Sequence, residues 1–339
     1  MGSKKLRTQK QAVKQPANVE MPMVQNHSSI AVKQPKTPFY TIFYVVAIIL
    51  VLIFLFNWII NACYTNAAMN ADPSISNNQQ LLMEKVQELI SKSAVHPILQ
   101  RIVLSVSILI GLLFFFKKTE KTDVSALGLF NKQKLAANIG IGLVAGFLAI
   151  LVIYNVLIVF GWYEFTGVFR YTPLQFLWLL EIIVCVLSEE LLFRGYLKYK
   201  FSNIKPIYMY AISTVLFVLF KALGSTMPST YITFAVMNIF LMYMYIKFDS
   251  PWFGVAFRFM WLLISGLVIS IYSPAVPGIF ESLPRVENLF AGSRAGFESG
   301  LIAATVLALA FVGVKFITDG RLKPGEKHVR KLQKDGTIR

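Results

Sequence analysis

The stretch VLSEELLFRGYL, residues 186–197, places two glutamates and an arginine inside an otherwise apolar run. A charged side chain at the centre of a bilayer costs at least about 2.5–3.5 kcal/mol, so Glu189, Glu190 and Arg194 need a physical reason to be there. Glu190 and Arg194 are four residues apart and can pair along a helix. Such groups can serve hydrolysis, relay charge across a membrane, or form structural ion pairs.

Three further charged residues lie in apolar runs: Glu181, Lys221 and Arg258. Together with the first three they make three acids and three bases, so the set is neutral when all are ionised. Because an unpaired buried charge costs far more than a paired one, we expect the six side chains to meet inside a helical bundle. The alternative is that these charges are unrelated and reach water at the membrane surface or in a pocket.

These residues must be positioned by membrane-spanning helices. The 339-residue chain is 56% hydrophobic and only 15% charged, whereas soluble proteins are about a quarter charged. A helical span needs roughly 20 apolar residues. We predict an all-α polytopic membrane protein, a bundle of about eight transmembrane helices, with spans near residues 39–63, 99–116, 135–160, 174–198, 206–223, 229–246, 251–272 and 299–317.

The distribution of basic residues predicts the topology. The whole chain has a net charge of +16. If the N-terminus is cytoplasmic, the segments that the predicted spans place on the cytoplasmic side hold 24 of the 33 Lys and Arg residues. This bias follows the positive-inside rule. We therefore predict a multi-pass protein of the cell membrane with both termini in the cytoplasm. The basic tails should face anionic lipid headgroups, and nucleic acid need not be invoked as a partner.

Composition also predicts how the chain is organised. Two segments outside the spans carry apolar residues at helical spacing: Leu82, Val86, Leu89 and Ile90 in one, and Ile279, Phe280, Leu283, Val286 and Phe290 in the other. Each either lies on the membrane surface or caps the bundle, or docks a partner.

Gly142 and Gly146 have the spacing of close helix contacts. We expect a disordered basic cytoplasmic tail (1–38), three spans with an outside amphipathic segment (39–173), a charged core (174–272), an outside loop with the last span (273–317) and a basic tail (318–339).

The charged core resembles a known family. The EExxxR pattern of Glu189, Glu190 and Arg194 is similar to the first motif of the CAAX-processing and bacteriocin-processing intramembrane endopeptidases, the CPBP or Abi family. The family's second motif, Phe-x-x-x-His, corresponds to Phe217 and Lys221 in ISTVLFVLFKAL. Its third, His-x-x-x-Asn, corresponds to Arg258 and Leu262 in SPWFGVAFRFMWLL. The resemblance implies a CPBP-like core over residues 174–272.

The departures from the family pattern concern its chemistry. The resemblance implies two glutamates and two histidines that bind a metal or activate a water for peptide hydrolysis. This chain has three histidines, His27, His96 and His328, and none between residues 97 and 327. Lysine and arginine stay protonated beside carboxylates and are poor zinc ligands. The two cysteines, Cys63 and Cys185, are far apart and have no metal-binding spacing. We therefore expect a degenerate site without a metal or other cofactor.

Three functions remain open at this stage. The first is a non-catalytic protein with the CPBP fold that binds and regulates or scaffolds another membrane or cell-envelope protein. The second is an active CAAX-type endopeptidase acting on a lipidated or leader peptide, with Glu189 as base, Lys221 deprotonated by burial, and zinc as a conceivable cofactor. The third is a transporter that relays charge, although the hydropathy shows no inverted repeat.

Overall fold

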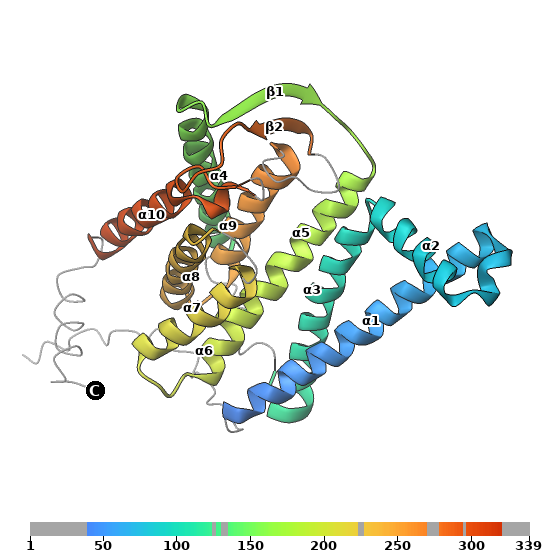
Figure 1. Ribbon diagram of the computed structural model, residues 1–339. Coiled ribbons are helices and arrows are strands. Elements are labelled where there is room, and N and C mark those ends of the chain that lie inside the picture. The colour runs from blue at the N-terminus through green and yellow to red at the C-terminus, as the bar shows by residue number, and fades with distance from the viewer. Residues whose placement is uncertain are drawn as a thin grey trace, which may run out of the picture. The chain divides into compact units, whose positions relative to one another are not determined.

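The structure is a computed structural model of the chain (Figure 1). It describes residues 39–123, 127–129, 135–222, 227–269, 278–293 and 296–320, all of which belong to one compact unit, residues 33–339. The predicted disordered tail, 1–38, lies outside the described residues, as does nearly all of the predicted basic tail at the C-terminus.

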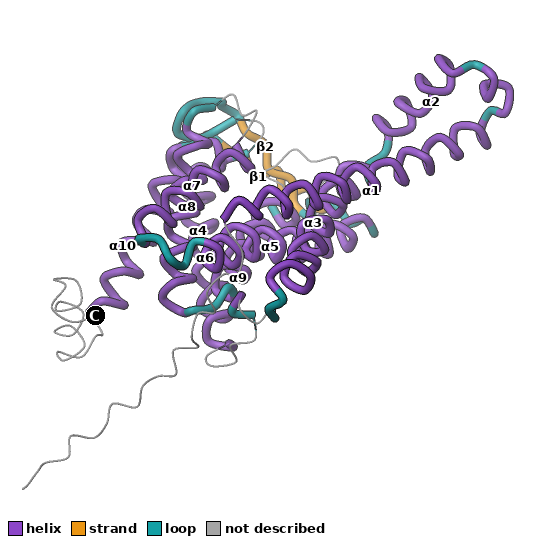
Figure 2. The backbone as a smooth tube through the Cα atoms, turned by 90° about the horizontal axis from the view of Figure 1, so that it is seen from below, coloured by secondary structure: helices purple, strands orange, loops and turns teal. Residues whose placement is uncertain are grey.

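The described chain is helical almost throughout, as Figure 2 shows. Its helices are α1 (Ile42–Ala71), α2 (Gln79–Lys92), α3 (His96–Phe115), α4 (Leu135–Val159), α5 (Leu174–Glu190), α6 (Leu197–Lys200), α7 (Pro206–Ala222), α8 (Ser229–Phe248), α9 (Trp252–Leu262) and α10 (Leu301–Gly320). Three π-helical segments continue or join them: Phe116–Glu120 after α3, Leu191–Tyr196 between α5 and α6, and Leu263–Val268 after α9. Short 3-10 turns cover Phe39–Thr41, Pro73–Asn77 and Phe297–Ser299.

Each of the eight predicted spans corresponds to one of these helical segments. Helices α1, α3, α4 and α8 are long and apolar enough to cross a membrane, and α7, α9 and α10 are shorter apolar helices. The remaining predicted span, residues 174–198, corresponds to α5, the π-helical turn and the start of α6, and it carries the acidic residues. The prediction of an all-α multi-pass membrane protein is confirmed.

One prediction of helical structure was wrong. Residues 279–290 do not form an amphipathic helix, because Phe280–Pro284 form strand β2. This strand pairs antiparallel with β1 (Tyr163–Phe169), Tyr163 lying opposite Pro284 and Phe169 opposite Phe280. Pro284 cannot donate a backbone hydrogen bond and would disrupt a helix interior, whereas it is tolerated at the end of an edge strand.

The other amphipathic segment is a helix, as predicted. Its apolar face packs against α1 through Val86, and Tyr64 of α1 donates a hydrogen bond to Ser93 Oγ just after the helix. On the opposite face, hydrogen bonds from Lys92 and Lys85 lower the pKa of Glu88 to about 2. Helix α2 thus forms a hairpin with the C-terminal part of α1 (Figure 2).

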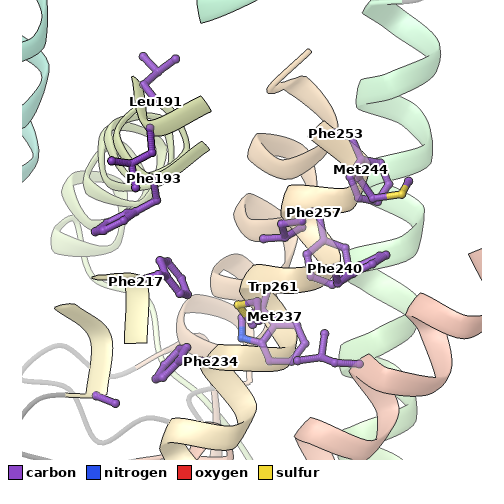
Figure 3. Close-up of a cluster of buried hydrophobic side chains, with 14 of the residues drawn as sticks. Leu191, Phe193, Phe217, Phe234, Met237, Phe240, Met244, Phe253, Phe257 and Trp261 are labelled. Atoms are coloured by element: carbon purple, nitrogen blue, oxygen red, sulfur yellow. The ribbon is translucent and has the colours of Figure 1, made fainter. Parts of the chain in front are cut away.

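The core around the charged site is aromatic. Phe193, Phe217, Phe234, Phe240, Phe253, Phe257 and Trp261 are buried in one cluster contributed by α7, α8, α9 and the π-helical turn after α5 (Figure 3). Aromatic rings of this kind pack edge-to-face or offset with centroids 4.5–7 Å apart, and Phe193 and Phe217 meet edge-to-face at 5.3 Å. This cluster forms an apolar wall beside the charged residues.

Candidate intramembrane charged site

The structure brings Glu189 together with both bases that stand in the positions of the family's histidines. Lys221 Nζ on α7 donates a hydrogen bond of 3.0 Å to Glu189 Oε1. Arg258 Nη2 on α9 lies 2.8 Å from Oε2, an ion-pair contact without hydrogen-bond geometry. Glu189 and Arg258 are buried, whereas Lys221 keeps about 21% of its side chain exposed. Each carboxylate oxygen of Glu189 therefore faces a cation from a different helix.

Glu190 and Arg194 form a second ion pair on the same helical segment. Arg194 Nη1 donates to Glu190 Oε1 over 2.8 Å, and both side chains are fully buried. Room for this pair comes from Gly254 on α9, because a Cβ atom there would overlap Glu190 Oε2. The π-helical turn that carries Arg194 begins directly after Glu190, and such turns often occur at functional sites.

Phe217 lies close to both arginines. Its ring centre is 4.4 Å from Arg194 Cζ and 5.5 Å from Arg258 Cζ. Both distances are within the range at which a desolvated cation is attracted to an aromatic face, by about 2 kcal/mol in favourable cases. Phe217 is completely buried in the aromatic cluster of Figure 3, so its ring can stabilise both guanidinium groups. In the sequence, Phe217 is marked only by its place in the family motif.

Glu181 takes a partner that the sequence analysis did not select. Its carboxylate lies 3.6 Å from Nε of Arg101 on α3. Glu181, Cys185 and Glu189 follow one another at intervals of four residues on α5, and the Cys185 thiol donates to Glu189 Oε1 over 3.3 Å. The six-residue cluster expected from the sequence is thus a central group of five, with Glu181 held separately by Arg101.

Two glycines of α4 set the position of the helix that carries Arg258. A Cβ atom on Gly142 would stand 2.6 Å from the Phe253 carbonyl oxygen, and one on Gly146 would stand 2.5 Å from that of Phe257. Real Cβ atoms do not approach this closely, so only glycine permits the observed contact of α4 with α9. The close contact predicted from this spacing is confirmed.

A further buried ion pair was not predicted from the sequence. Lys200 Nζ of α6 donates to Glu120 Oε1 over 2.7 Å, and the Tyr199 hydroxyl donates to Glu120 Oε2 over 3.2 Å. Glu120 and Lys200 are both inaccessible to solvent, and the pair joins the end of α3 to the end of α6. Both residues lie in polar stretches that looked like surface loops, so nothing in the pattern distinguished them.

The remaining residues of interest lie away from the central group. His96 begins α3 and meets the Tyr64 ring edge-on at 5.4 Å. Leu262, at the position of the family's asparagine, packs against the apolar cluster that contains Trp178 and Ile182. Neither residue supplies a polar atom to Glu189.

The central group does not fit a metal ion. Among the described residues, no three His, Cys, Asp or Glu side chains gather as ligands. Zinc sites use imidazole, thiolate or carboxylate groups, whereas the groups facing Glu189 are an ammonium and a guanidinium. When all groups are ionised, three bases face two acids, so the site carries net positive charge and repels a further cation.

Comparison with known families agrees with the resemblance seen in the sequence. Residues 171–264 match the family model described as type II CAAX prenyl endopeptidase Rce1-like. This segment is similar to a CAAX endopeptidase. The match confirms the recognition made from the EExxxR motif and its downstream frames, and it contains every member of the central charged group. Neither a curated protein nor a solved structure matches the chain.

The CAAX-endopeptidase-like segment thus supplies the helices that carry the site. Helices α5 to α9 lie within it, whereas α1 to α4 and α10 lie outside it. The chain is a multi-pass membrane protein in which this segment is similar to CAAX endopeptidases. Its departures from the family motifs, Lys221 and Arg258, both contact the first motif glutamate.

Proposed function

We propose that this protein is a non-catalytic relative of the CAAX endopeptidases that binds and regulates another membrane or cell-envelope protein. The observation that carries this proposal is the pairing of Glu189 with both Lys221 and Arg258. These bases stand where the family pattern has histidines, and each contacts one oxygen of the carboxylate that would have to serve as base or ligand.

The chemistry of these groups argues against peptide hydrolysis. A general base must accept a proton from an attacking water, whereas the two cations beside Glu189 stabilise its ionised form and oppose its protonation. A guanidinium neither ligates zinc nor accepts a proton in proteins. The same contacts are well suited to a structural role, because they tie α5, α7 and α9 together inside the bundle.

The length and the amide side chains of helix α1 support an interaction with a protein partner. Helix α1 has 30 residues, about ten more than a perpendicular span requires, so it either tilts or extends beyond the bilayer together with α2. It also carries Asn57 and Asn61 four residues apart, and Asn61 is exposed. Amides on a transmembrane helix commonly bond to a neighbouring helix, which a partner would supply.

A peptidase assay tests the non-catalytic part of this proposal. Purified protein in lipid nanodiscs would be incubated with prenylated CAAX peptides and with leader peptides, alongside a Glu189→Gln variant. We expect no cleavage above that of the variant. Cleavage that is present in the wild type and lost in Glu189→Gln would overturn the proposal.

Crosslinking in native membranes tests the partner. We expect one membrane or membrane-anchored protein to be captured in near-stoichiometric amount by the wild type, and equally by Glu189→Gln if that variant remains folded. Replacing Asn57 and Asn61 by leucine should reduce the capture, whereas the matched change Asn155→Leu on exposed α4 should not. Recovery of no such partner, or equal capture by all variants, would contradict the proposed interaction through α1.

A further inference from the structure

An apolar groove runs between α1 and α3 on the surface of the bundle. Its volume is about 340 Å³, at the lower end of the range of ligand pockets. Every side chain that lines it is apolar: Ala47, Ile48, Val51 and Leu52 from α1, with Ile110 and Phe114 from α3. The groove lies outside the CAAX-endopeptidase-like segment and is separate from the charged site.

The groove arises from the way the two helices meet. Gly111 of α3 lies against Ile49 of α1, where a Cβ atom would stand 2.7 Å from Ile49 Cγ1. Val45 and Ile49 are buried in this contact together with Ile108 and Leu112. The residues next to them on α1 are turned outward, so they flank the contact and leave a furrow beside it.

One end of the groove is positively charged. Lys117 and Lys118 follow Phe114 by three and four residues, which places them beyond it on the same side of the helix. Both are exposed, and neither forms an ion pair with a described residue. The nearby Glu120 does not neutralise them, because it is buried against Lys200 on the inner side.

Aromatic residues mark the same level of α1. Ile49 of α1 contacts Gly111 of α3. Tyr44 lies five residues before Ile49, and Phe116 lies five residues after Gly111, so Tyr44 lies level with Phe116, directly before the two lysines. Tyr44 is 60% exposed and precedes Ile48 by four residues, and Tyr40 one turn earlier is 53% exposed. Exposed tyrosines and lysines at the end of a span are typical of the headgroup level of a membrane.

We propose that this groove binds an anionic glycerophospholipid, with its phosphate at Lys117 and Lys118 and one acyl chain along Phe114, Ile110 and the facing residues of α1. The distance from Lys118 to Ile110 along the helix is about 12 Å, which matches the upper part of an acyl chain. Basic residues at the end of a groove between transmembrane helices are a recognised arrangement for acidic lipids. The two lysines, rather than the apolar lining, select an anionic lipid over a zwitterionic one.

Such a lipid would stabilise the attachment of α1. Only a small part of the α1 surface is buried in the described structure, mainly against α2 and α3. A bound lipid that contacts α1 with its chain and the end of α3 with its headgroup joins the two helices from outside. The bound lipid thereby supports the helix that leads into the α1–α2 hairpin.

Lipid titration of the purified protein tests the proposal. Phosphatidylglycerol and phosphatidylcholine would be added separately to delipidated protein in detergent, with bound lipid measured by native mass spectrometry and stability by melting temperature. We expect phosphatidylglycerol to remain bound and to raise the melting temperature more than phosphatidylcholine. The double variant Lys117→Gln/Lys118→Gln should lose at least about tenfold in affinity for phosphatidylglycerol.

Matched variants separate this site from general attraction to the membrane. Val51→Trp fills the groove and should also weaken phosphatidylglycerol binding, whereas Val144→Trp on the exposed face of α4 should not. Lys205→Gln, another exposed lysine, should leave the affinity unchanged. Equal effects of both lipids, or equal losses in Lys205→Gln and the double lysine variant, would overturn the proposal. A photoreactive acyl chain should label α1 and α3, and labelling confined to other helices would contradict it too.

Discussion

Glu189 connects three helices, because its carboxylate on α5 contacts Lys221 on α7 and Arg258 on α9. Removing one partner of a buried ion pair typically costs about 3–5 kcal/mol, since the remaining charge is left without compensation. Lys221 is partly exposed, so water can replace part of its contribution to Glu189. Arg258 is buried, so water cannot replace its contact with Glu189.

This difference gives a first prediction. Arg258→Ala should lower the melting temperature in detergent by more than Lys221→Ala does, and both should exceed the exposed control Lys205→Ala. Glu189→Gln in the Arg258→Ala background should recover part of the loss, because it removes the stranded charge. A double-mutant cycle on melting temperature measures this coupling. Additive effects would mean that Glu189 and Arg258 do not stabilise each other.

A second prediction concerns metal binding. The wild-type protein should purify without stoichiometric zinc, because the groups facing Glu189 are cations. Replacing them in Lys221→His/Arg258→His leaves Glu189 beside two imidazoles, the three-ligand set of many catalytic zinc sites. We expect this variant to bind about one zinc ion per chain, and Lys221→Gln/Arg258→Gln to bind none. Elemental analysis is the measurement. Zinc in the wild type that disappears in Glu189→Ala would contradict the prediction.

At the residue scale, the sequence predicted contacts that follow from spacing within a helix or from the family frame. The interval from Glu190 to Arg194 is fixed by helix geometry, and the frame identified Lys221 and Arg258. Contacts between helices of unknown rotation could not be predicted in this way. The pairs Arg101 with Glu181 and Lys200 with Glu120 depend on how α3 packs on α5 and α6, which no local pattern encodes.

At the scale of elements, helices were predictable and the sheet was not. A span is defined by some twenty consecutive apolar residues, a strong local signal. Strands β1 and β2 are short and lie more than a hundred residues apart in the chain, and each is paired with the other in a two-stranded sheet. Pro284 was the available sign that residues 279–290 do not continue as a helix.

The contact of α4 with α9 gives a third prediction. Gly142→Ala and Gly146→Ala each place a Cβ atom against a backbone carbonyl of α9, so they should separate the helices and displace Arg258. Forced overpacking of this kind costs roughly 1–3 kcal/mol. Gly140→Ala is the matched control, since a Cβ atom there meets nothing within 4 Å. We expect lower melting temperatures for the first two variants and no decrease for the control. Equal behaviour of all three would mean that the helices are not in close contact.

At the scale of the whole molecule, contacts between loops sort the connecting segments into two groups. One group joins Glu120 to Lys200, Lys198 to Asp249, and Tyr245 to the Leu127 carbonyl oxygen. The other joins Glu164 to Arg285, Arg170 to Glu281, and Ser229 to the Ser299 carbonyl oxygen. Every contact links segments that lie on the same side of the membrane if the eight predicted spans alternate in direction.

Which of the two groups faces the cytoplasm is the subject of the last prediction. The first group is rich in lysine, so the positive-inside rule places it in the cytoplasm together with both tails and residues 119–133, and places residues 66–95 and 274–297 outside. In a background with Cys63→Ala and Cys185→Ala, an impermeant maleimide should label Gln87→Cys and Leu289→Cys in intact cells.

Asn203→Cys, between α6 and α7, should be labelled only after the membrane is permeabilised, although its position is equally exposed. The three positions belong to different loops, so an error in a single span would reverse the labelling of one position alone. Labelling of Asn203→Cys from outside, with protection of the other two, would reverse the orientation of the whole bundle. It would also place Lys117, Lys118 and their proposed lipid in the outer leaflet, because these lysines lie three and two residues before Glu120 at the same end of the bundle.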